Sequence, residues 1–527
     1  MSKSSLSLSS RLGKLLVSLA LASAAALPAQ AESLFLVPYH AAEKPIVDAQ
    51  GRKSIIIDFV DDAHEKFPKD PPPGWDSKAS FHRPQVVNLV NAHAKTHGYE
   101  PQGMTTWVGS STTAYLNEAQ IKRMREDKSV KLLTENEPLQ ASSSPPWSDA
   151  LNYSYAGFEW QPWGRTATNG KAKLPDSNRF VYVIDSGVAY HNDLGSVVDR
   201  VNVNCGGGIN CSTGGPADEY PVVGCYAHAT HVAGIVGATA DNAQGVRGMY
   251  AGVKMISVAM SRATIDTVGQ CASHPNIDNT AASTNSLGYA LDYVFWRVFN
   301  TQTTDVPIVT LSFNGGRLGF ETDGSPQTNR WKLQRLVEPY NYPYLWYYPG
   351  VFFVQSAGNF AADSCALPSL AYRASVSYSG VSSTDGIMVV GAINSSGRPV
   401  TTAEPFTAPS PAALGAPPAS NFGQCTDVWA PGDSVLSTWG RHTDLGYYMY
   451  SLVSEVYGGT APWGTSGWLY LSGTSMAAPH VAAAAAYLAD LHGLTTPAAI
   501  EAKVRTHFTA TGYSDPLGVP VHRVELP

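Results

Sequence analysis

The residues that decide the fold read GTSMAAPH, from Gly473 to His480, and continue directly as the alanine-rich run VAAAAAYL, from Val481 to Leu488. A small, turn-prone beginning followed by small apolar residues predicts a buried helix that starts close to Ser475. We expect Pro479 in its first turn, where a residue without an N–H group is tolerated. Ser475 would then lie where unpaired N–H groups and the helix dipole favour developing negative charge. Such a position suits a nucleophile, although serine is also an ordinary N-cap residue.

Two upstream segments carry what a nucleophilic serine needs, a base and a carboxylate that orients the base. The apolar run FVYVI, from Phe180 to Ile184, predicts a buried parallel strand, and Asp185 follows at the end where α/β sheets bind ligands. The segment HATHVAGIVG, from His228 to Gly237, predicts a helix of small residues that begins with a histidine. Alone, Asp185 would indicate a turn and His228 a surface or core side chain. Together the three segments indicate a catalytic triad.

These blocks resemble those of the subtilisin-like serine proteases, the subtilase family, in which aspartate, histidine and serine follow one another in this order. The resemblance implies that Asp185 orients the imidazole, that His228 is general base and then general acid, and that Ser475 attacks the scissile carbonyl. His231 and His480 would be structural. An α/β-hydrolase would have the order Ser, Asp, His, and a chymotrypsin-like protease the order His, Asp, Ser, so neither fits.

A donor for the oxyanion follows another strand. The run VFFV, from Val351 to Val354, predicts a buried strand and leads into QSAGN, which ends at Asn359. This segment matches the family's oxyanion-hole segment, so the Asn359 amide is expected to act with the backbone N–H of Ser475. Without the other motifs, Gly-Asn would indicate only a turn.

The segment IVTLSFNGG, from Ile308 to Gly316, resembles the family's strand that pairs with an extended polypeptide substrate. Two short segments would form the walls of the pocket for the side chain before the cut: Ser312, Phe313, Asn314, Gly315, Ala357 and Gly358. Phe313 and Asn314 replace smaller or aliphatic residues, which leaves the cleavage specificity open. Ala229 replaces the family's usual glycine after the catalytic histidine, a change that we do not expect to inactivate the enzyme.

Residues 1–31 have the features of a secretory signal peptide. Three basic residues precede the apolar segment 15–27, and Ala29-Gln30-Ala31 offers a small-residue cleavage pattern. We therefore expect secretion to the periplasm or the medium. No stretch approaches the ~20 strongly apolar residues of a membrane-spanning helix.

Residues 32–140 are richer in charge and contain no triad motif. A helix is predicted over residues 115–125 and a strand over residues 129–137. These features resemble the second half of a subtilase propeptide, which in the family is a small α+β chaperone whose tail occupies the substrate groove as an inhibitor. Maturation is expected between about residues 139 and 160, which leaves 141–527 as the catalytic domain. An ordinary N-terminal domain is the alternative.

The six cysteines are consistent with an oxidising compartment. They all lie in the expected catalytic domain, and their spacing does not fix the pairing, although a local bond between the first two is plausible: Cys205, Cys211, Cys225, Cys271, Cys365 and Cys425.

The resemblance also implies a structural calcium ion, held by Asn242 in the loop after the histidine helix with help from Asp193. Oxygen ligands on a loop suit that cation. No cofactor would be needed for the chemistry.

The composition agrees with a globular α/β enzyme of 527 residues, with 15% charged residues and a formal net charge of −7. This mild acidity gives no electrostatic footprint for nucleic acid. We expect a mostly parallel sheet flanked by helices, preceded by a small α+β domain, in a monomeric, secreted, self-processing serine endopeptidase that forms an acyl-enzyme. The alternatives are a pseudoprotease or binding protein that keeps the fold without turnover, and a serine esterase on the same scaffold.

Overall fold

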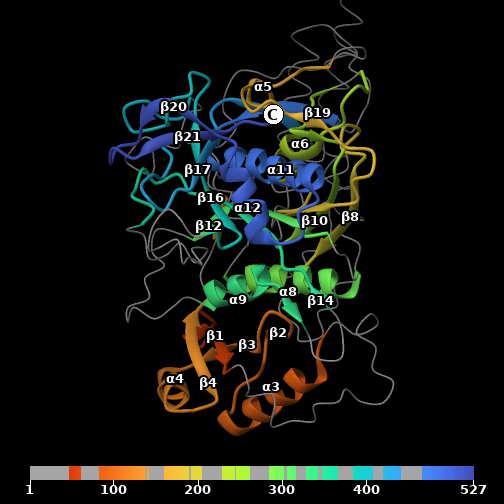
Figure 1. Ribbon diagram of the computed structural model, residues 1–527. Coiled ribbons are helices and arrows are strands. Elements are labelled where there is room, and N and C mark those ends of the chain that lie inside the picture. Colours follow the sequence, from red (N-terminus) through yellow and green to blue (C-terminus); the bar gives the residue numbers. More distant parts are fainter. Residues whose placement is uncertain are drawn as a thin grey trace, which may run out of the picture.

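The computed structural model describes two packed units, an N-terminal unit of residues 47–136 and a large unit of residues 159–527 (Figure 1). The described residues are 47–60, 82–136, 139–141, 159–188, 191–203, 228–243, 245–260, 284–301, 305–315, 328–341, 347–365, 384–407, 419–440 and 466–527.

The N-terminal unit is an antiparallel sheet with two helices on one face. The sheet has the order β2-β3-β1-β4, and the elements are β1 (Lys53–Phe59), α3 (Pro84–His97), β2 (Gly103–Thr105), β3 (Ser111–Leu116), α4 (Glu118–Arg125) and β4 (Val130–Glu135). Alternate residues of β1, such as Ile57 and Phe59, form the core with α3 and α4. The predicted helix and strand of this region are found as α4 and β4. The helix begins later than predicted, because Tyr115 and Leu116 belong to β3 and Asn117 starts α4 with a capping box.

The large unit is built on a nine-stranded sheet with the order β20-β21-β17-β16-β15-β11-β7-β10-β8. Its strands are β7 (Phe180–Asp185), β8 (Val197–Asn202), β10 (Lys254–Ala259), β11 (Ile308–Leu311), β15 (Phe352–Ser356), β16 (Ile387–Ile393), β17 (Val428–Pro431), β20 (Phe508–Ser514) and β21 (Pro520–Val524). All neighbours pair in parallel except β20 and β21. The expected α/β class is therefore confirmed.

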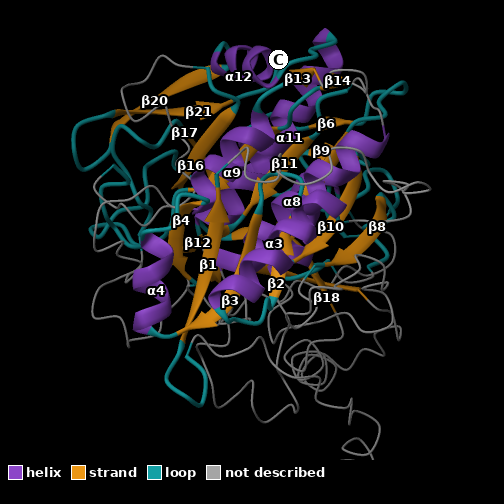
Figure 2. Cartoon of the chain, turned by 90° about the horizontal axis from the view of Figure 1, so that it is seen from below, coloured by secondary structure: helices purple, strands orange, loops and turns teal. Residues whose placement is uncertain are grey.

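Helices cover both faces of this sheet, which is why its strands are continuously apolar. In β7, Val181 and Val183 face the core that contains α6 (His228–Gly237), α11 (Thr474–His492) and α12 (Pro497–Arg505). Tyr182 and Ile184 face the opposite core, with α8 (Thr284–Thr301) and α9 (Thr328–Val337). The N-terminal unit lies against the outer side of α8 and α9 (Figure 1), and it overlies these helices when the molecule is seen from below (Figure 2).

Short elements complete the described structure. They are β5 (Leu139–Ala141), α5 (Trp163–Ala167), β6 (Lys171–Ala172), β9 (Tyr250–Ala251), β12 (Phe313–Gly315), β13 (Tyr340–Asn341), β14 (Tyr347–Tyr348), β18 (Val435–Gly440) and β19 (Ser466–Leu471).

One disulfide bond, Cys365–Cys425, joins two described loops, with the two Cα atoms 5.2 Å apart. The other four cysteines, the expected signal peptide and the segment 142–158 lie outside the described residues. Within the part of the chain that the structure describes, no helix has the length and apolar character needed to cross a membrane.

Candidate active site

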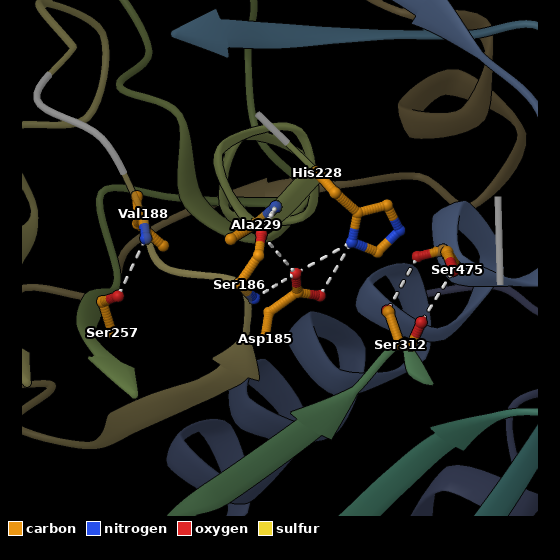
Figure 3. Close-up of polar contacts among 8 residues, drawn as sticks. All are labelled: Asp185, Ser186, Val188, His228, Ala229, Ser257, Ser312 and Ser475. Atoms are coloured by element: carbon orange, nitrogen blue, oxygen red, sulfur yellow. Dashed lines mark hydrogen bonds and ion pairs between the residues drawn. The ribbon is translucent and has the colours of Figure 1, made fainter. Parts of the chain in front are cut away.

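The predicted aspartate and histidine meet where β7 ends and α6 begins. The Nδ1 atom of His228 lies 2.8 Å from Oδ1 and 2.9 Å from Oδ2 of Asp185, and both side chains are buried (Figure 3). Ser186 also orients the carboxylate, because its backbone N–H and its hydroxyl donate to Asp185 Oδ1 at 2.6 and 3.1 Å. The carboxylate therefore fixes the orientation of the imidazole.

The imidazole is also held by an aromatic contact. The ring of Phe313 meets the ring of His228 edge to face, with centroids 5.6 Å apart and planes at 87°. Phe313 is fully buried, so it forms part of the wall beside the His228 ring.

Ser475 lies in the first turn of α11, across from the second ring nitrogen of His228 (Figure 3). Its hydroxyl donates to the backbone oxygen of Ser312 at 2.9 Å. In return, the Ser312 hydroxyl donates to the backbone oxygen of Ser475 at 3.0 Å. These reciprocal bonds fix the serine at the end of β11.

The predicted place of Pro479 is wrong, because this residue lies in the second turn of α11 and not in the first. In a regular helix its N–H would donate to the carbonyl four residues earlier, which belongs to Ser475. Proline has no such donor, and the Ser312 hydroxyl occupies that acceptor instead. The proline thus leaves the Ser475 carbonyl available for the hydrogen bond from Ser312.

Asn359 is hydrogen-bonded to Thr474, the residue before Ser475. Its Oδ1 atom accepts hydrogen bonds from the backbone N–H of Thr474 at 3.0 Å and from the Thr474 hydroxyl at 2.9 Å. This bonding orients the amide and leaves its NH₂ group on the other side of the side chain. Gly358, just before it, has φ +99°, a backbone conformation that favours glycine.

Sequence reasoning missed Asn421, which shapes this turn from a separate loop. Its Nδ2 atom donates to the backbone oxygen of Ala357 at 2.8 Å, and its Oδ1 accepts from the backbone N–H of Phe360 at 2.9 Å. A lone asparagine in an irregular segment carries no sequence signal for this role.

The expected substrate-binding segment is already paired with a strand. β12 pairs antiparallel with β5, and Phe313, Asn314 and Gly315 lie opposite Ala141, Gln140 and Leu139. Within the candidate pocket, Ser312, Phe313 and Ala357 are fully buried. The tail of the predicted propeptide therefore lies along the strand that was predicted to bind substrate.

The two predicted calcium ligands, Asp193 and Asn242, lie together and are joined by a hydrogen bond. The buried Asp193 carboxylate accepts from Asn242 Nδ2 at 2.7 Å, from Val246 N–H at 2.8 Å and from Trp468 Nε1 at 3.2 Å. Burial raises the pKa of Asp193 to about 6, although the three hydrogen bonds lower it in part. Both carboxylate oxygens serve N–H donors, so the calcium site stays a prediction.

The two companion histidines lie in the core beside the site. His231 Nε2 lies 3.1 Å from the backbone oxygen of Val435, and His480 Nδ1 lies 2.8 Å from that of Met476. Burial lowers the pKa of His480 to about 4, so its ring is neutral near neutral pH. These contacts agree with structural roles.

Comparisons with known proteins agree with the geometry. A family model described as the Subtilase family matches residues 176–518, well over half of the chain. An extracellular protease of Xanthomonas campestris pv. campestris is 24% identical over 417 residues, covering 73% of this chain and 56% of that protein. A cuticle-degrading protease of Metarhizium anisopliae is 33% identical over 129 residues, covering 23% of this chain and 26% of that protein.

Among solved structures, fervidolysin from Fervidobacterium pennivorans, a keratinolytic enzyme related to subtilisin, has a TM-score of 0.50 at 15% identity. The match covers 93% of this chain and 63% of that one. At this identity the likeness concerns the fold alone. The chain spans only about half, or less, of the length of the two sequence relatives.

Proposed function

This chain belongs to the subtilase family, and from that premise we propose that it is a secreted serine endopeptidase made as a self-processing zymogen. The observation that carries the proposal is the buried contact between Asp185 and His228 beside Ser475, at the carboxyl edge of a parallel sheet. An oriented base next to a serine at a helix start is the arrangement that acyl transfer requires.

In this mechanism Ser475 first turns from the Ser312 carbonyl toward His228. The imidazole takes the hydroxyl proton while Oγ bonds to the carbonyl carbon of the substrate, and the carbonyl oxygen becomes an oxyanion. The Asn359 amide and the Ser475 N–H donate to that oxyanion. His228 then gives its proton to the leaving amine, and water cleaves the acyl-enzyme by the same steps in reverse.

The N-terminal unit would act as the inhibitor of this site. Two contacts support that role: β5 pairs with the substrate-binding strand β12, and Asp292 of α8 accepts three backbone N–H bonds from residues 106–108 at 2.5 to 2.8 Å. An extended tail that adds a strand beside the catalytic serine occupies the path of any polypeptide substrate.

The register of this pairing suggests where the chain cuts itself. Ala141 is the last described residue of β5 and lies opposite Phe313, the residue that follows Ser312. The carbonyl of Ser312 is the group that holds the Ser475 hydroxyl. We therefore expect cleavage next to Ser142, inside the range of 139 to 160 predicted above.

The test is the intact mass and N-terminal sequence of the exported protein, compared with the Ser475→Ala variant. We expect the wild type to begin close to residue 143 and the variant to keep its N-terminal unit. Equal trimming of both would assign the processing to another protease, and no trimming of either would overturn the zymogen proposal. Labelling of Ser475 by a fluorophosphonate separates an active enzyme from a pseudoprotease with the same fold, and peptide against ester substrates separates it from an esterase.

A further inference from the structure

The N-terminal unit contains a cluster of metal-binding side chains that the protease proposal does not use. His93 and His97 are one helical turn apart on α3, and Asp127 lies in the turn between α4 and β4. One ligand atom from each of the three lies within 4.8 Å of the other two. Because residues four apart project from the same face of a helix, both imidazoles point at the same carboxylate.

His93 has a ring nitrogen that is aimed at this point. The residue is only 7% exposed, and its Nε2 atom has no hydrogen-bond partner among the described residues, with Asp127 Oδ2 at 3.5 Å. A buried polar atom normally finds a partner, because leaving it unsatisfied is costly. An ion between Nε2 and the carboxylate would supply the missing interaction.

The surroundings orient His93 as metal-binding histidines are usually oriented. Its Nδ1 atom lies 2.8 Å from the Tyr99 hydroxyl, on the far side of the ring. When Nδ1 carries the proton and donates to that oxygen, the lone pair is on Nε2, which faces Asp127.

Asp127 is oriented in the same way. Its Oδ1 atom accepts the backbone N–H and the hydroxyl of Ser129 at 2.8 and 2.6 Å, so these bonds anchor one oxygen. The other oxygen, Oδ2, faces the histidines and lies 2.8 Å from His97 Nε2. A bound ion would replace that last hydrogen bond and draw both groups to it.

We propose that His93, His97 and Asp127 form a binding site for a divalent transition-metal ion of the zinc type. Two imidazole nitrogens and one carboxylate oxygen are ligands that Zn²⁺ accepts, whereas Ca²⁺ prefers oxygen ligands alone. With Zn–N and Zn–O distances of about 2.0–2.2 Å, the ligand atoms of one ion lie roughly 3–4 Å apart. The observed separations need only a small adjustment, and water completes the tetrahedron.

The ion would connect α3 with the turn between α4 and β4 in the N-terminal unit. It would hold α3 to the turn that leads into β4, and β4 pairs with the central strand β1. A small domain gains much from such a link, because an ion that binds only the folded state stabilises that state. The metal would thus strengthen the fold of the unit that lies against the protease, at a place separate from Asp185, His228 and Ser475.

The test titrates Zn²⁺ into the full-length Ser475→Ala protein, which cannot process itself, and follows binding by calorimetry and thermal unfolding. His97→Gln and Asp127→Asn each remove one ligand, and His492→Gln is the matched control, because that histidine is exposed at the end of α11. We expect the parent and the control to bind one ion per chain. In both ligand variants this binding should be lost, or its affinity should fall by at least about tenfold.

Co²⁺ provides a second readout that does not depend on stability. Its visible absorption should show tetrahedral coordination in the parent protein and lose that component in His97→Gln. Circular dichroism without metal identifies a variant that fails to fold, and Asp127→Asn then carries the test. Equal Zn²⁺ binding in the parent and in both folded ligand variants, or no binding in the parent, would overturn the proposal.

Discussion

Two serines hold each other at the centre of the candidate site. Ser475 donates to the Ser312 carbonyl, and Ser312 donates to the Ser475 carbonyl, which Pro479 leaves without a helical donor. In the proposed mechanism the side chain of Ser312 is therefore a positioning group, because it fixes the backbone of Ser475.

The change Ser312→Ala should show this role. It leaves a buried carbonyl unsatisfied, which costs about 1–3 kcal/mol of stability, and it loosens Ser475. We expect kcat to fall by about tenfold, equivalent to ~1.4 kcal/mol, with a smaller effect on KM. Ser437→Ala is the control, since it removes another buried hydroxyl that donates to a carbonyl, that of His231 at 2.7 Å. A similar loss of kcat in both variants would contradict the positioning role.

Asn359 allows its two functions to be separated. Asn359→Asp keeps the acceptor that serves Thr474 but loses the NH₂ donor, whereas Asn359→Ala loses both. We expect kcat to fall by about 100- to 1,000-fold in the aspartate variant, the range measured for loss of one such donor in subtilisin. Its thermal stability should stay closer to the wild type than that of the alanine variant. An aspartate variant with normal kcat would show that the amide only positions the turn.

At the scale of an element, α12 is attached to the sheet through a buried carboxylate. Glu501 is fully buried, and its two oxygens accept the Gly386 N–H at 2.8 Å and Arg505 Nε at 2.9 Å. Burial outweighs these partners and raises the pKa of Glu501 from 4.5 to about 7.

This shift predicts a pH-dependent stability. A raised carboxyl pKa in the folded state means that the stabilisation is complete below about pH 4.5 and is lost as the pH rises through about 7. The contribution is on the order of 3 kcal/mol, from 1.36 kcal/mol for each pKa unit. Thermal unfolding of Ser475→Ala with and without Glu501→Gln should show a shallower fall in Tm over this interval when the carboxyl is absent. Parallel curves would contradict the assignment.

At the scale of the whole molecule, the two units share a buried ion pair. Lys332 of α9 lies 3.3 Å from Asp58 of β1 and donates to the Ser111 hydroxyl at 2.9 Å, with both charged side chains almost fully buried. Breaking such a pair leaves a buried charge without compensation and costs about 3–5 kcal/mol.

Lys332→Met should therefore weaken the attachment of the N-terminal unit. In the Ser475→Ala background we expect faster hydrogen exchange in β1 and α8, measured by mass spectrometry. The control is Lys53→Met, because Lys53 pairs with Glu135 at 2.7 Å on the surface, where an ion pair contributes little. Exchange that stays unchanged in Lys332→Met, or rises equally in both variants, would contradict a role for the buried pair in attachment.

Much of this architecture could be predicted from local sequence. Asp185 ends an apolar strand and Asn359 follows another, whereas His228 and Ser475 lie at the start of helices of small residues. In each case the motif lies in or next to the element that positions it. Periodicity identifies such elements, and parallel strands bring their carboxyl ends to one edge. The class of fold and the helix and strand before residue 137 therefore followed from contiguous residues, as did the hypothesis of a triad in the order Asp, His, Ser.

Other features were decided by the tertiary structure, because they join residues that no local pattern relates. The packing of distant segments decides where Pro479 lies in its helix and which carbonyl Ser312 binds. It also decides the hydrogen bond from Asn421 to the Ala357 carbonyl. The choice of Cys365–Cys425 and the meeting of Asp127 with the α3 histidines are of the same kind. A short polar contact between remote segments leaves no periodic trace in a sequence, whereas burial and hydrogen bonding make it specific once the chain has folded.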